Sequence, residues 1–289
     1  MNATPQAVFD PIRYKETTRE QWDKAAEAWH RWGPLLSKWL GPATNQMLDK
    51  AGVRQGSRVL DVAAGAGEQT MSIAKRVGSG GAVLATDISA RILGFVEQSA
   101  EEQGHRHVCI RELDGEGLDA LEADAFDAVI SRVGLIYFPD QQRALRGMYR
   151  ALKPGGKMAA MVYSTAEMNP FFSIPVSIIR RRAALPPPLP GQPGPFSLGA
   201  AGVLEKSFSE AGFTDVETIR VAAPVLLENA AECLRFEKES FGALHQMLSS
   251  LNPADQVSAW EEIETALGEF EGDGGFSGPC EMVIAVGSK

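Results

Sequence analysis

A run of small residues after the first apolar strand candidate is the segment of this chain best suited to hold a ligand. The strand candidate Arg58–Val62 leads into Ala63-Ala64-Gly65-Ala66-Gly67, and helical periodicity begins near Gln69. Glycine tolerates strained dihedral angles and lets a ligand lie against the backbone, and the following helix aims its free N–H groups at the same spot. The segment therefore predicts a ligand-binding turn, with an ordinary tight strand-to-helix turn as the alternative.

Three aspartates stand at the ends of three successive strand candidates. Asp87 lies 20 positions beyond Gly67, a separation typical of an acid that accepts the hydroxyls of a nucleotide ribose. An N-cap for the helix that starts near Ser89 is the alternative role. Together with Asp61 and Asp114, Asp87 places three carboxylates along one rim of the expected sheet. Such a rim disfavours a dinucleotide pyrophosphate and suits a ligand with ribose hydroxyls, an adenine amine and a positive centre.

The elements that must position these acids alternate between strands and helices. Apolar runs predict strands at Arg58–Val62, Ala82–Thr86, Val108–Leu113, Ala125–Ser131 and Lys157–Tyr163. Helical patterns lie between them, at Gln69–Val77, Ala90–Gln103 and Gln141–Leu152. This alternation predicts an α/β fold with a doubly wound, Rossmann-like parallel sheet.

The rest of the chain predicts additions to one domain. Residues 20–49 have a helical pattern that breaks at Gly33-Pro34, and they indicate an N-terminal cap. Residues 184–199 hold six prolines and predict an irregular surface segment that closes over something. A helix at 200–211, a strand at 216–225, a mostly helical stretch at 230–270 and a last strand at 281–286 are expected to follow. The expected organisation is a helical cap at 1–50, a binding core at 51–163, a Pro-rich lid at 164–199, and the rest of the sheet with a helical insertion at 200–289.

Charge and cysteine content exclude several classes of protein. The chain has 289 residues and a formal net charge of -9, which disfavours binding to duplex nucleic acid or to an anionic membrane surface. No segment has the roughly 20 apolar residues of a membrane span, and residues 1–10 show no secretory signal. Three widely separated cysteines, Cys109, Cys233 and Cys280, suit reduced thiols. A cytoplasmic protein is expected.

Five motifs in this order resemble those of class I S-adenosylmethionine-dependent methyltransferases, in particular the UbiE/COQ5-like (type 11) branch. They are Asp61-x-Ala-Ala-Gly65-x-Gly67-x-x-Thr70, Asp87, Asp114-Gly-Glu116, Phe126-Asp127-Ala-Val-Ile-Ser131-Arg132 and Lys153-Pro154-Gly155-Gly156-Lys157. The resemblance covers residues 21–162 well and the tail from residue 196 more loosely. It implies a seven-stranded sheet, S-adenosylmethionine as methyl donor and S-adenosylhomocysteine as product.

The resemblance also implies roles for individual residues around the donor. The turn of Gly65 and Gly67 would lie under its methionine and ribose, with Asp61 ordering the loop and the ammonium end. Asp87 would hold the ribose hydroxyls, Ile88 would pack on the adenine, and Asp114 would accept from the adenine amine. Other implied positions are Gly115 and Glu116 at the adenine edge, Trp29 over the sulfonium, Ser131 and Arg132 between donor and substrate, and Thr70 in the turn motif. Ala63 replaces the branch's glycine and is expected to crowd the turn slightly.

Catalytic residues are harder to assign, because methyl transfer is an in-line displacement that depends mainly on alignment. A general base is needed only if the acceptor loses a proton. His30 in the cap, Tyr137 after the fourth strand and His245 in the helical insertion are candidates, with His30 favoured because its helix should overhang the donor. Each is also compatible with a structural role. No metal site is expected: His105-x-His107 has no acidic partners, and Cys280 is interpreted as a buried thiol.

The combined hypothesis is a methyltransferase that acts on a small molecule at oxygen, carbon or nitrogen, a phenol or quinol among the possibilities. A catalytically silent donor-binding module and an NAD(P)-dependent oxidoreductase are the alternatives. The oxidoreductase fingerprint would have a third glycine where this chain has Thr70. The expected partner is a small-molecule substrate, and a homodimer is one alternative for the oligomeric state.

Overall fold

The protein is described by a computed structural model that covers residues 9–189 and 191–289. A mixed seven-stranded sheet forms its centre, in the order β3-β2-β1-β4-β5-β10-β6. The strands are β1 (Arg58–Val62), β2 (Ala82–Asp87), β3 (Val108–Glu112), β4 (Phe126–Arg132), β5 (Leu152–Tyr163), β6 (Thr214–Ala222) and β10 (Glu281–Ser288). The first five run parallel, and β10 lies antiparallel between β5 and β6. The expected doubly wound sheet of the class I methyltransferase fold is confirmed.

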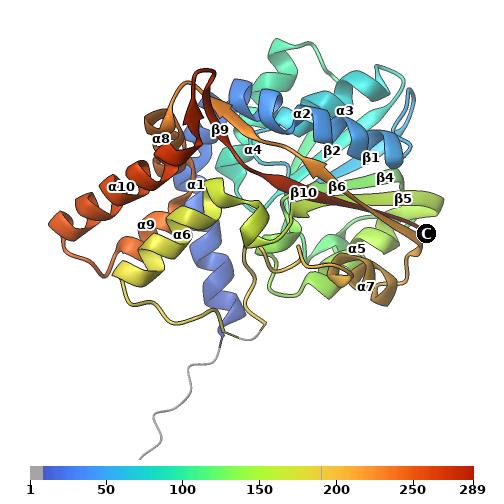
Figure 1. Cartoon of the computed structure of the whole chain (residues 1–289). Helices are drawn as coiled ribbons and strands as arrows, with labels where there is room; N and C mark the ends of the chain where they lie inside the picture. The colour runs from blue at the N-terminus through green and yellow to red at the C-terminus, as the bar shows by residue number, and fades with distance from the viewer. Residues whose placement is uncertain (1–8, 190) are drawn as a thin grey trace, which may run out of the picture.

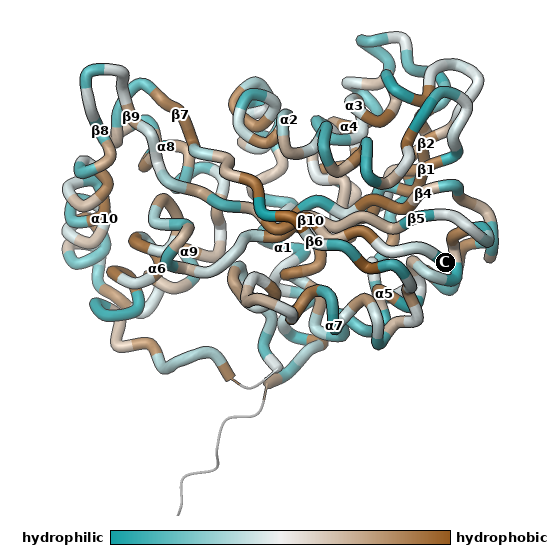
Figure 2. The backbone as a smooth tube through the Cα atoms, turned by 45° about the vertical axis from the view of Figure 1, so that its right-hand side comes forward, coloured by the Kyte–Doolittle hydropathy of each residue, from teal (hydrophilic) through white to brown (hydrophobic). Residues whose placement is uncertain are grey.

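The central strands are apolar because helices cover both faces of the sheet. In β1 every residue after Arg58 is buried, and the tube in Figure 2 has brown segments at β1 and β4. One face carries α2 (Gly33–Lys50), α3 (Glu68–Val77) and α4 (Ala90–Glu102), and the other carries α5 (Gln141–Ala151) and α7 (Val203–Glu210) (Figure 1). A parallel sheet buried on both faces explains why these strands read as continuous apolar runs.

The helical cap consists of α1 (Pro11–Arg31) followed by α2. The break predicted at Gly33-Pro34 is confirmed, since Trp32 separates the two helices. The first helix begins earlier than its periodicity indicated, because Asp10 caps it by accepting from the N–H groups of Ile12 and Arg13. It packs along α4 and also contacts α8 (Ala230–Ser240). The cap therefore joins the sheet to the helical part of the chain.

A second group of elements lies beside the sheet. It contains α6 (Pro170–Arg182), α8, α9 (Gly242–Leu248) and α10 (Pro253–Leu267), as Figure 1 shows. A small sheet in the order β7-β9-β8 completes it, from Val225–Leu227, Gly275–Gly278 and Glu271–Gly272. The single strand predicted at 216–225 is wrong in this respect: the chain changes sheets after Ala222, so that β6 and β7 belong to different sheets.

Several other expectations have an outcome in the structure. The three cysteines are free thiols, Cys109 exposed and the other two buried. Across the two described ranges, no helix is both long enough and apolar enough to cross a membrane. The interpretation of the extreme N-terminus falls almost wholly on residues 1–8, and one of the six prolines is Pro190; these positions lie outside the described residues.

Candidate functional site

A cavity lies where the carboxyl ends of β1, β2 and β4 face the cap helices. It holds about 1130 Å³ of space not filled by atoms, its open mouth included. Its lining comes from α1 and α2, the glycine-rich turn, the loops after β2, β3 and β4, and single residues of β5 and the α8–α9 junction. The lining residues are Lys15, Thr18, Trp22, Trp29, Leu36, Trp39, Leu40, Ala63, Ala64, Gly65, Ala66, Glu68, Gln69, Asp87, Ile88, Leu113, Asp114, Gly115, Arg132, Val133, Gly134, Tyr137, Phe138, Pro139, Tyr163 and Phe241.

Asp61 holds the glycine-rich turn from its buried side, which does not face the cavity. Its carboxylate accepts hydrogen bonds from the side-chain amide of Gln69 and, at 2.7 Å, from the hydroxyl of Thr70. Asp61 and Thr70 are fully buried and do not line the cavity. Burial raises the pKa of Asp61 to about 6, while these two hydrogen bonds act in the opposite direction. The expectation that Asp61 orders the loop agrees with this geometry; a direct contact with a ligand would need the turn to move.

Asp87 also holds the turn, but from the cavity side. One carboxylate oxygen accepts from the N–H of Gly65 and the other from the N–H of Ser89, each at 3.0 Å. The N-cap of α4 is Ser89, whose hydroxyl oxygen accepts from the N–H of Ile92, so the alternative reading of Asp87 as that N-cap is wrong. Burial raises the pKa of Asp87 to about 6. A carboxylate that lines the cavity can accept further hydrogen bonds from a ligand.

The turn is strained at the position where glycine was expected. Ala63 has φ 58°, in the left-handed region that favours glycine. A Cβ on Gly65 would meet nothing within 4 Å, whereas one on Gly67 would stand 3.0 Å from the backbone of Val96. Gly65 therefore opens onto the cavity, and Gly67, which does not line it, permits close packing of α3 against α4.

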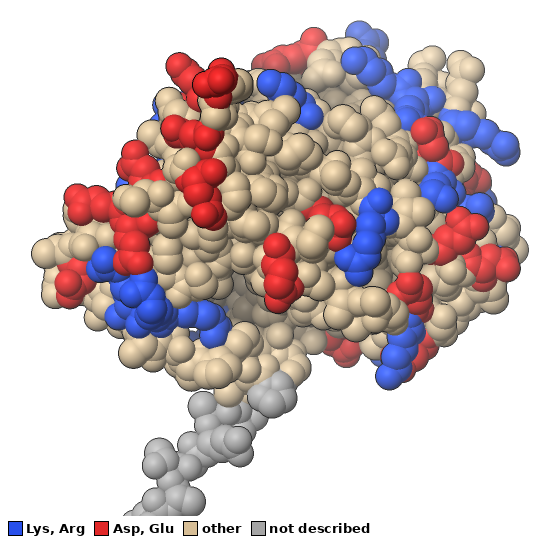
Figure 3. Space-filling model, viewed as in Figure 1, with Lys and Arg blue, Asp and Glu red and all other residues tan. Residues whose placement is uncertain are grey.

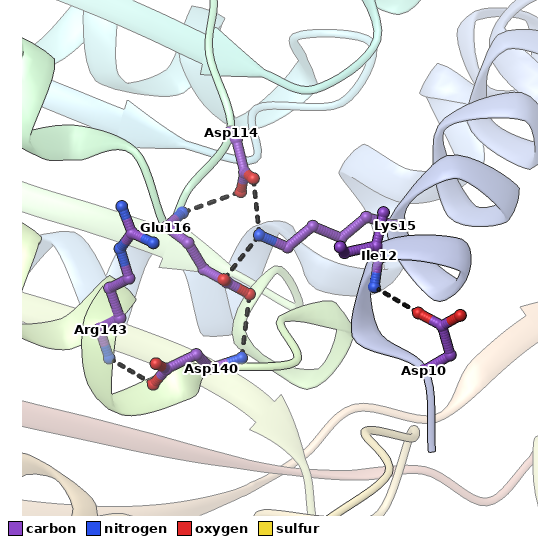
Figure 4. A network of polar contacts seen from close by, with 7 residues as sticks. All are labelled: Asp10, Ile12, Lys15, Asp114, Glu116, Asp140 and Arg143. Carbon is purple, nitrogen blue, oxygen red and sulfur yellow. Dashed lines mark hydrogen bonds and ion pairs between the residues drawn. The ribbon is translucent and has the colours of Figure 1, made fainter. Parts of the chain in front are cut away.

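Asp114 and Glu116 lie at one end of the cavity, where Lys15 of α1 connects them (Figure 4). The Lys15 ammonium lies 2.7 Å from a carboxylate oxygen of Asp114 and 2.6 Å from one of Glu116. The other oxygen of each acid accepts from a backbone N–H, that of Glu116 and that of Asp140 respectively, at 2.9 Å. Burial alone would lower the pKa of Lys15, but its hydrogen bonds to both acids raise it instead. Asp114 and Gly115 line the cavity, whereas Glu116 does not line it and pairs with Lys15.

The end of β4 adds an ion pair to the cavity floor. Arg132 pairs with Glu68 of α3, and its guanidinium also donates to the hydroxyl of Thr44 at 3.0 Å. Both charged side chains are 10 % exposed. Ser131 is fully buried and is not on the lining, so it does not lie between donor and substrate as the resemblance implied. Val133 follows in the left-handed region, with φ 61°, which is a rare conformation for a β-branched residue.

The other end of the cavity is aromatic. The ring of Trp22 lies 5.3 Å from that of Tyr137 and 5.4 Å from that of Trp29, centroid to centroid. Trp29 also contacts Phe241 at 5.7 Å, and its indole N–H donates to the carbonyl of Ser240 at 2.9 Å. Trp29 is therefore fixed at the wall of the cavity, as its implied contact with a donor requires.

The candidate bases have separate locations. His30 stacks on Phe95 of α4, with ring centroids 4.5 Å apart, and His245 bonds the carbonyl of Lys238 at 2.7 Å; neither lines the cavity. The prediction that His30 faces the donor is wrong, because its direction on α1 differs from that of Trp29. Tyr137 does line the cavity, but burial raises its phenol pKa further above the ordinary value, which disfavours a role as base.

The Pro-rich segment contacts the site only indirectly. Of the described residues between 164 and 199, none lines the cavity. Phe196 packs against Tyr163 at 6.3 Å, and Tyr163 is the cavity residue of β5. The cover of the cavity is formed by α1 and α2, so the expected lid is not supported by the lining.

Several lining residues had no signal in a single sequence. Lys15 contacts acids 99 and 101 positions away, and Phe241 and Tyr163 join the site from elements far apart in the chain. The helical pattern at residues 20–49 indicated a cap, but not that the cap would line a ligand cavity. Val133 and Gly134 directly follow the Ser-Arg motif and could have been included with it.

Comparison with known proteins identifies relatives for part of the chain. Residues 38–177 match the ubiE/COQ5 methyltransferase family. Over 118 residues the chain is 35% identical to the ubiquinone/menaquinone biosynthesis C-methyltransferase UbiE of Pectobacterium carotovorum subsp. carotovorum (strain PC1). It is 37% identical to UbiE of Methylococcus capsulatus (strain Bath), also over 118 residues. Each alignment covers 40% of this chain and 47% of the relative, so the chain spans about half the length of the curated relatives it matches.

Solved structures support the fold over more of the chain. The YcgJ protein of Bacillus subtilis is 19% identical with a TM-score of 0.59, covering 86% of this chain and 98% of its own. The Haemonchus contortus phosphoethanolamine N-methyltransferase 2, solved with phosphomonomethylethanolamine and S-adenosylhomocysteine, is 18% identical with a TM-score of 0.59. That alignment covers 98% of this chain and 60% of the other. The resemblance to UbiE/COQ5-like class I methyltransferases is thus confirmed for residues 38–177, and the fold for most of the chain.

Proposed function

We propose that this chain, whose residues 38–177 match the ubiE/COQ5 methyltransferase family, is an S-adenosylmethionine-dependent methyltransferase that acts on a small molecule. The observation that carries the proposal is the cavity at the carboxyl ends of β1, β2 and β4, where the Gly65 backbone and the Asp87 carboxylate face the same space. Ligands of doubly wound sheets bind at this edge.

The residues present fit the donor by chemistry and by shape. The donor would supply an electrophilic methyl group on a sulfonium, carried by an adenosine and an amino acid. Asp87 offers carboxylate oxygens to ribose hydroxyls, and the open side of Gly65 lets the donor approach the backbone. Ile88, Leu113 and Phe138 offer apolar surface to an adenine ring, beside the carboxylate of Asp114. The acids outnumber the cations along the lining, which favours a cationic ligand.

The remaining lining residues would hold the acceptor and exclude water. Arg132 is neutralised by Glu68, so the floor presents a fixed ion pair and not a free cation. Trp22, Trp29 and Tyr137 form a rigid apolar wall that keeps competing water from the methyl group. Alignment of acceptor and donor by these walls would supply most of the rate acceleration. Tyr137 would orient the acceptor by contact, and not by removing a proton.

Calorimetric titration with S-adenosylhomocysteine and, separately, with NAD tests the donor assignment. Binding of the adenosyl compound with no binding of NAD is expected; the reverse result would refute the proposal. Conversion of S-adenosylmethionine is then measured with a library of phenols, quinols and amines. Donor binding without turnover on any acceptor would favour a catalytically silent module. An acceptor atom that is oxygen, carbon or nitrogen, a cytoplasmic location and a homodimer are further predictions, and light scattering tests the last of them.

A further inference from the structure

A buried carboxyl group in α8 lacks a partner. Glu237 is 0 % exposed, and neither of its carboxyl oxygens has a hydrogen-bond partner among the described residues. The hydroxyl of Ser240, one turn further along the same helix, is likewise buried and unpartnered within those residues. Buried polar groups in native proteins are nearly always hydrogen-bonded, so a partner from outside the described chain is expected.

Glu237 and Ser240 do not line the cavity, but their backbone contacts two residues that line its aromatic end. The carbonyl of Ser240 accepts from the indole N–H of Trp29, and the carbonyl of Glu237 accepts from the N–H of Phe241, each at 2.9 Å. Trp29 follows Lys15 by 14 residues, about 20 Å along α1, so this part of the cavity lies away from the site proposed for the nucleoside. It is therefore available to the acceptor.

The charges around the cavity indicate what kind of acceptor would suit this carboxyl. Both cations of the lining are already paired, Lys15 with Asp114 and Glu116, and Arg132 with Glu68. An anionic acceptor would thus meet no available counter-charge among the described lining residues. A protonated amine would meet the faces of Trp29 and Phe241 on its way to the carboxyl, and aromatic faces attract cations.

We propose that Glu237 and Ser240 form the polar subsite for an amine-bearing aromatic acceptor, which reaches them past Phe241. The inference rests on the proposed methyltransferase function and adds its substrate class. Burial raises the pKa of Glu237 well above its ordinary value, which favours the uncharged carboxyl in the ligand-free protein. A bound ammonium group would favour the carboxylate, with release of the carboxyl proton to solvent. The group is therefore a cost to stability that is offset only when the acceptor is bound.

Three variants separate this role from a structural one. Glu237→Leu removes the unpartnered carboxyl and retains apolar packing, while Glu237→Gln keeps its shape but cannot ionise. Glu232→Leu makes the same replacement on the solvent side of α8, where Glu232 pairs with Arg235, and serves as the matched control. We expect Glu237→Leu to raise the melting temperature by roughly 2–6 °C, and the control to change it by about 1 °C. A lower melting temperature for Glu237→Leu would show that the carboxyl is satisfied in the ligand-free protein, and would overturn the proposal.

Binding is measured with benzylamine and 2-phenylethylamine against benzyl alcohol and 2-phenylethanol, in the presence of saturating S-adenosylhomocysteine. The wild-type protein is expected to bind an amine at least tenfold more tightly than its alcohol, and both Glu237 variants to lose that preference. Equal binding of amine and alcohol by the wild type would refute the subsite, as would an amine preference that survives in Glu237→Gln. Affinity for S-adenosylhomocysteine alone should not change in the variants. Failure of the wild type to bind that compound would instead refute the proposed function.

Discussion

Ala63 and Gly134 face each other across the floor of the cavity. The methyl group of Ala63 occupies the space that Gly134, which has no side chain, leaves free. A Cβ on Gly134 would stand 2.6 Å from the Cβ of Ala63 and 2.7 Å from the hydroxyl oxygen of Ser131. The loss of a glycine in the turn after β1 is thus matched by a glycine in the turn after β4. The crowding expected from Ala63 is accommodated by this second turn.

This relationship predicts coupled effects of substitution. Ala63→Gly should change the free energy of unfolding by between zero and about 1 kcal/mol in the stabilising direction, because relief of the left-handed strain is partly cancelled by backbone entropy. Gly134→Ala should destabilise by about 1–3 kcal/mol through overpacking. In the double variant the loss of free energy of unfolding should be smaller than the sum of the two single effects. Ala63→Gly removes the collision of the new Cβ with the methyl group of Ala63, while its collision with Ser131 remains. Chemical denaturation of all four proteins measures the coupling, and strict additivity would contradict it.

Removal of the Asp87 carboxylate should weaken donor binding. Asp87→Ala is expected to reduce the affinity for S-adenosylhomocysteine by about 1–3 kcal/mol, the range for a lost hydrogen bond to a charged group. Calorimetry measures the affinity, and thermal melting shows whether the substitution also destabilises the turn at Gly65. Asp119→Ala, on the surface after β3, is the control. An unchanged affinity in Asp87→Ala would remove the ribose assignment.

The buried acids predict how stability depends on pH. Asp61 and Asp87 have pKa values of about 6 in the folded protein against an ordinary value of 3.8. Between about pH 4 and pH 6 the folded state therefore binds more protons than the unfolded state, and these groups make the free energy of unfolding fall as pH rises. Each contributes on the order of 1–3 kcal/mol. Urea denaturation of the ligand-free protein at pH 4.5, 5.5 and 6.5 measures the slope, which Asp87→Asn should reduce; an identical slope in that variant would contradict the assignment.

Donor binding should depend on pH in the opposite direction. In the proposed site, ribose hydroxyls would donate to an ionised Asp87, so affinity for S-adenosylhomocysteine should rise between pH 5 and pH 7 and then level off. The same calorimetric titration at several pH values tests this. Affinity that is flat over that range in the wild type would mean that Asp87 does not contact the ligand.

Lys15 should stabilise the packing of α1 against the loop after β3. Lys15→Gln is expected to cost about 1–3 kcal/mol in the free energy of unfolding, because it leaves the largely buried Glu116 without its counter-charge. Arg19→Gln on the same helix is the matched control: its pair with Glu112 is nearly half exposed on both sides, so a loss below about 0.5 kcal/mol is expected. Equal effects of the two substitutions, measured by denaturation, would show that the Lys15 contacts contribute no more than a surface pair.

Sequence patterns were sufficient to predict the strands of the central sheet and the residues at the floor of the site. The strand Arg58–Val62 and the ends of its parallel neighbours follow from apolar runs bounded by turn residues, and Asp61, Gly65 and Asp87 follow from their spacing. These features are local, so a single sequence contains them. The small sheet was missed because β8 has two residues and β9 is a glycine-flanked tetrapeptide, too short for any periodicity.

The cover of the site could not be predicted, because it depends on long-range packing. Trp29 and His30 are neighbours in sequence but lie about 100° apart around α1, and only the docking of that helix decides which faces the cavity. In the structure Trp29 does, and His30 lies against Phe95. The ion pairs of Lys15 likewise depend on contacts between distant segments. The same holds for Glu237, which the packing of the described residues leaves without a hydrogen-bond partner for its carboxyl group.

The length of α1 has a consequence for the timing of a catalytic cycle. Lys15 and Trp29 stand at opposite ends of the cavity, yet both belong to this one helix, which is also bonded to α4 through Asp23 and the hydroxyl of Ser89 at 2.5 Å. In the proposed methyltransferase, S-adenosylhomocysteine and the methylated product would both leave from beneath this one helix. If release required α1 to move, both would leave with the same rate constant.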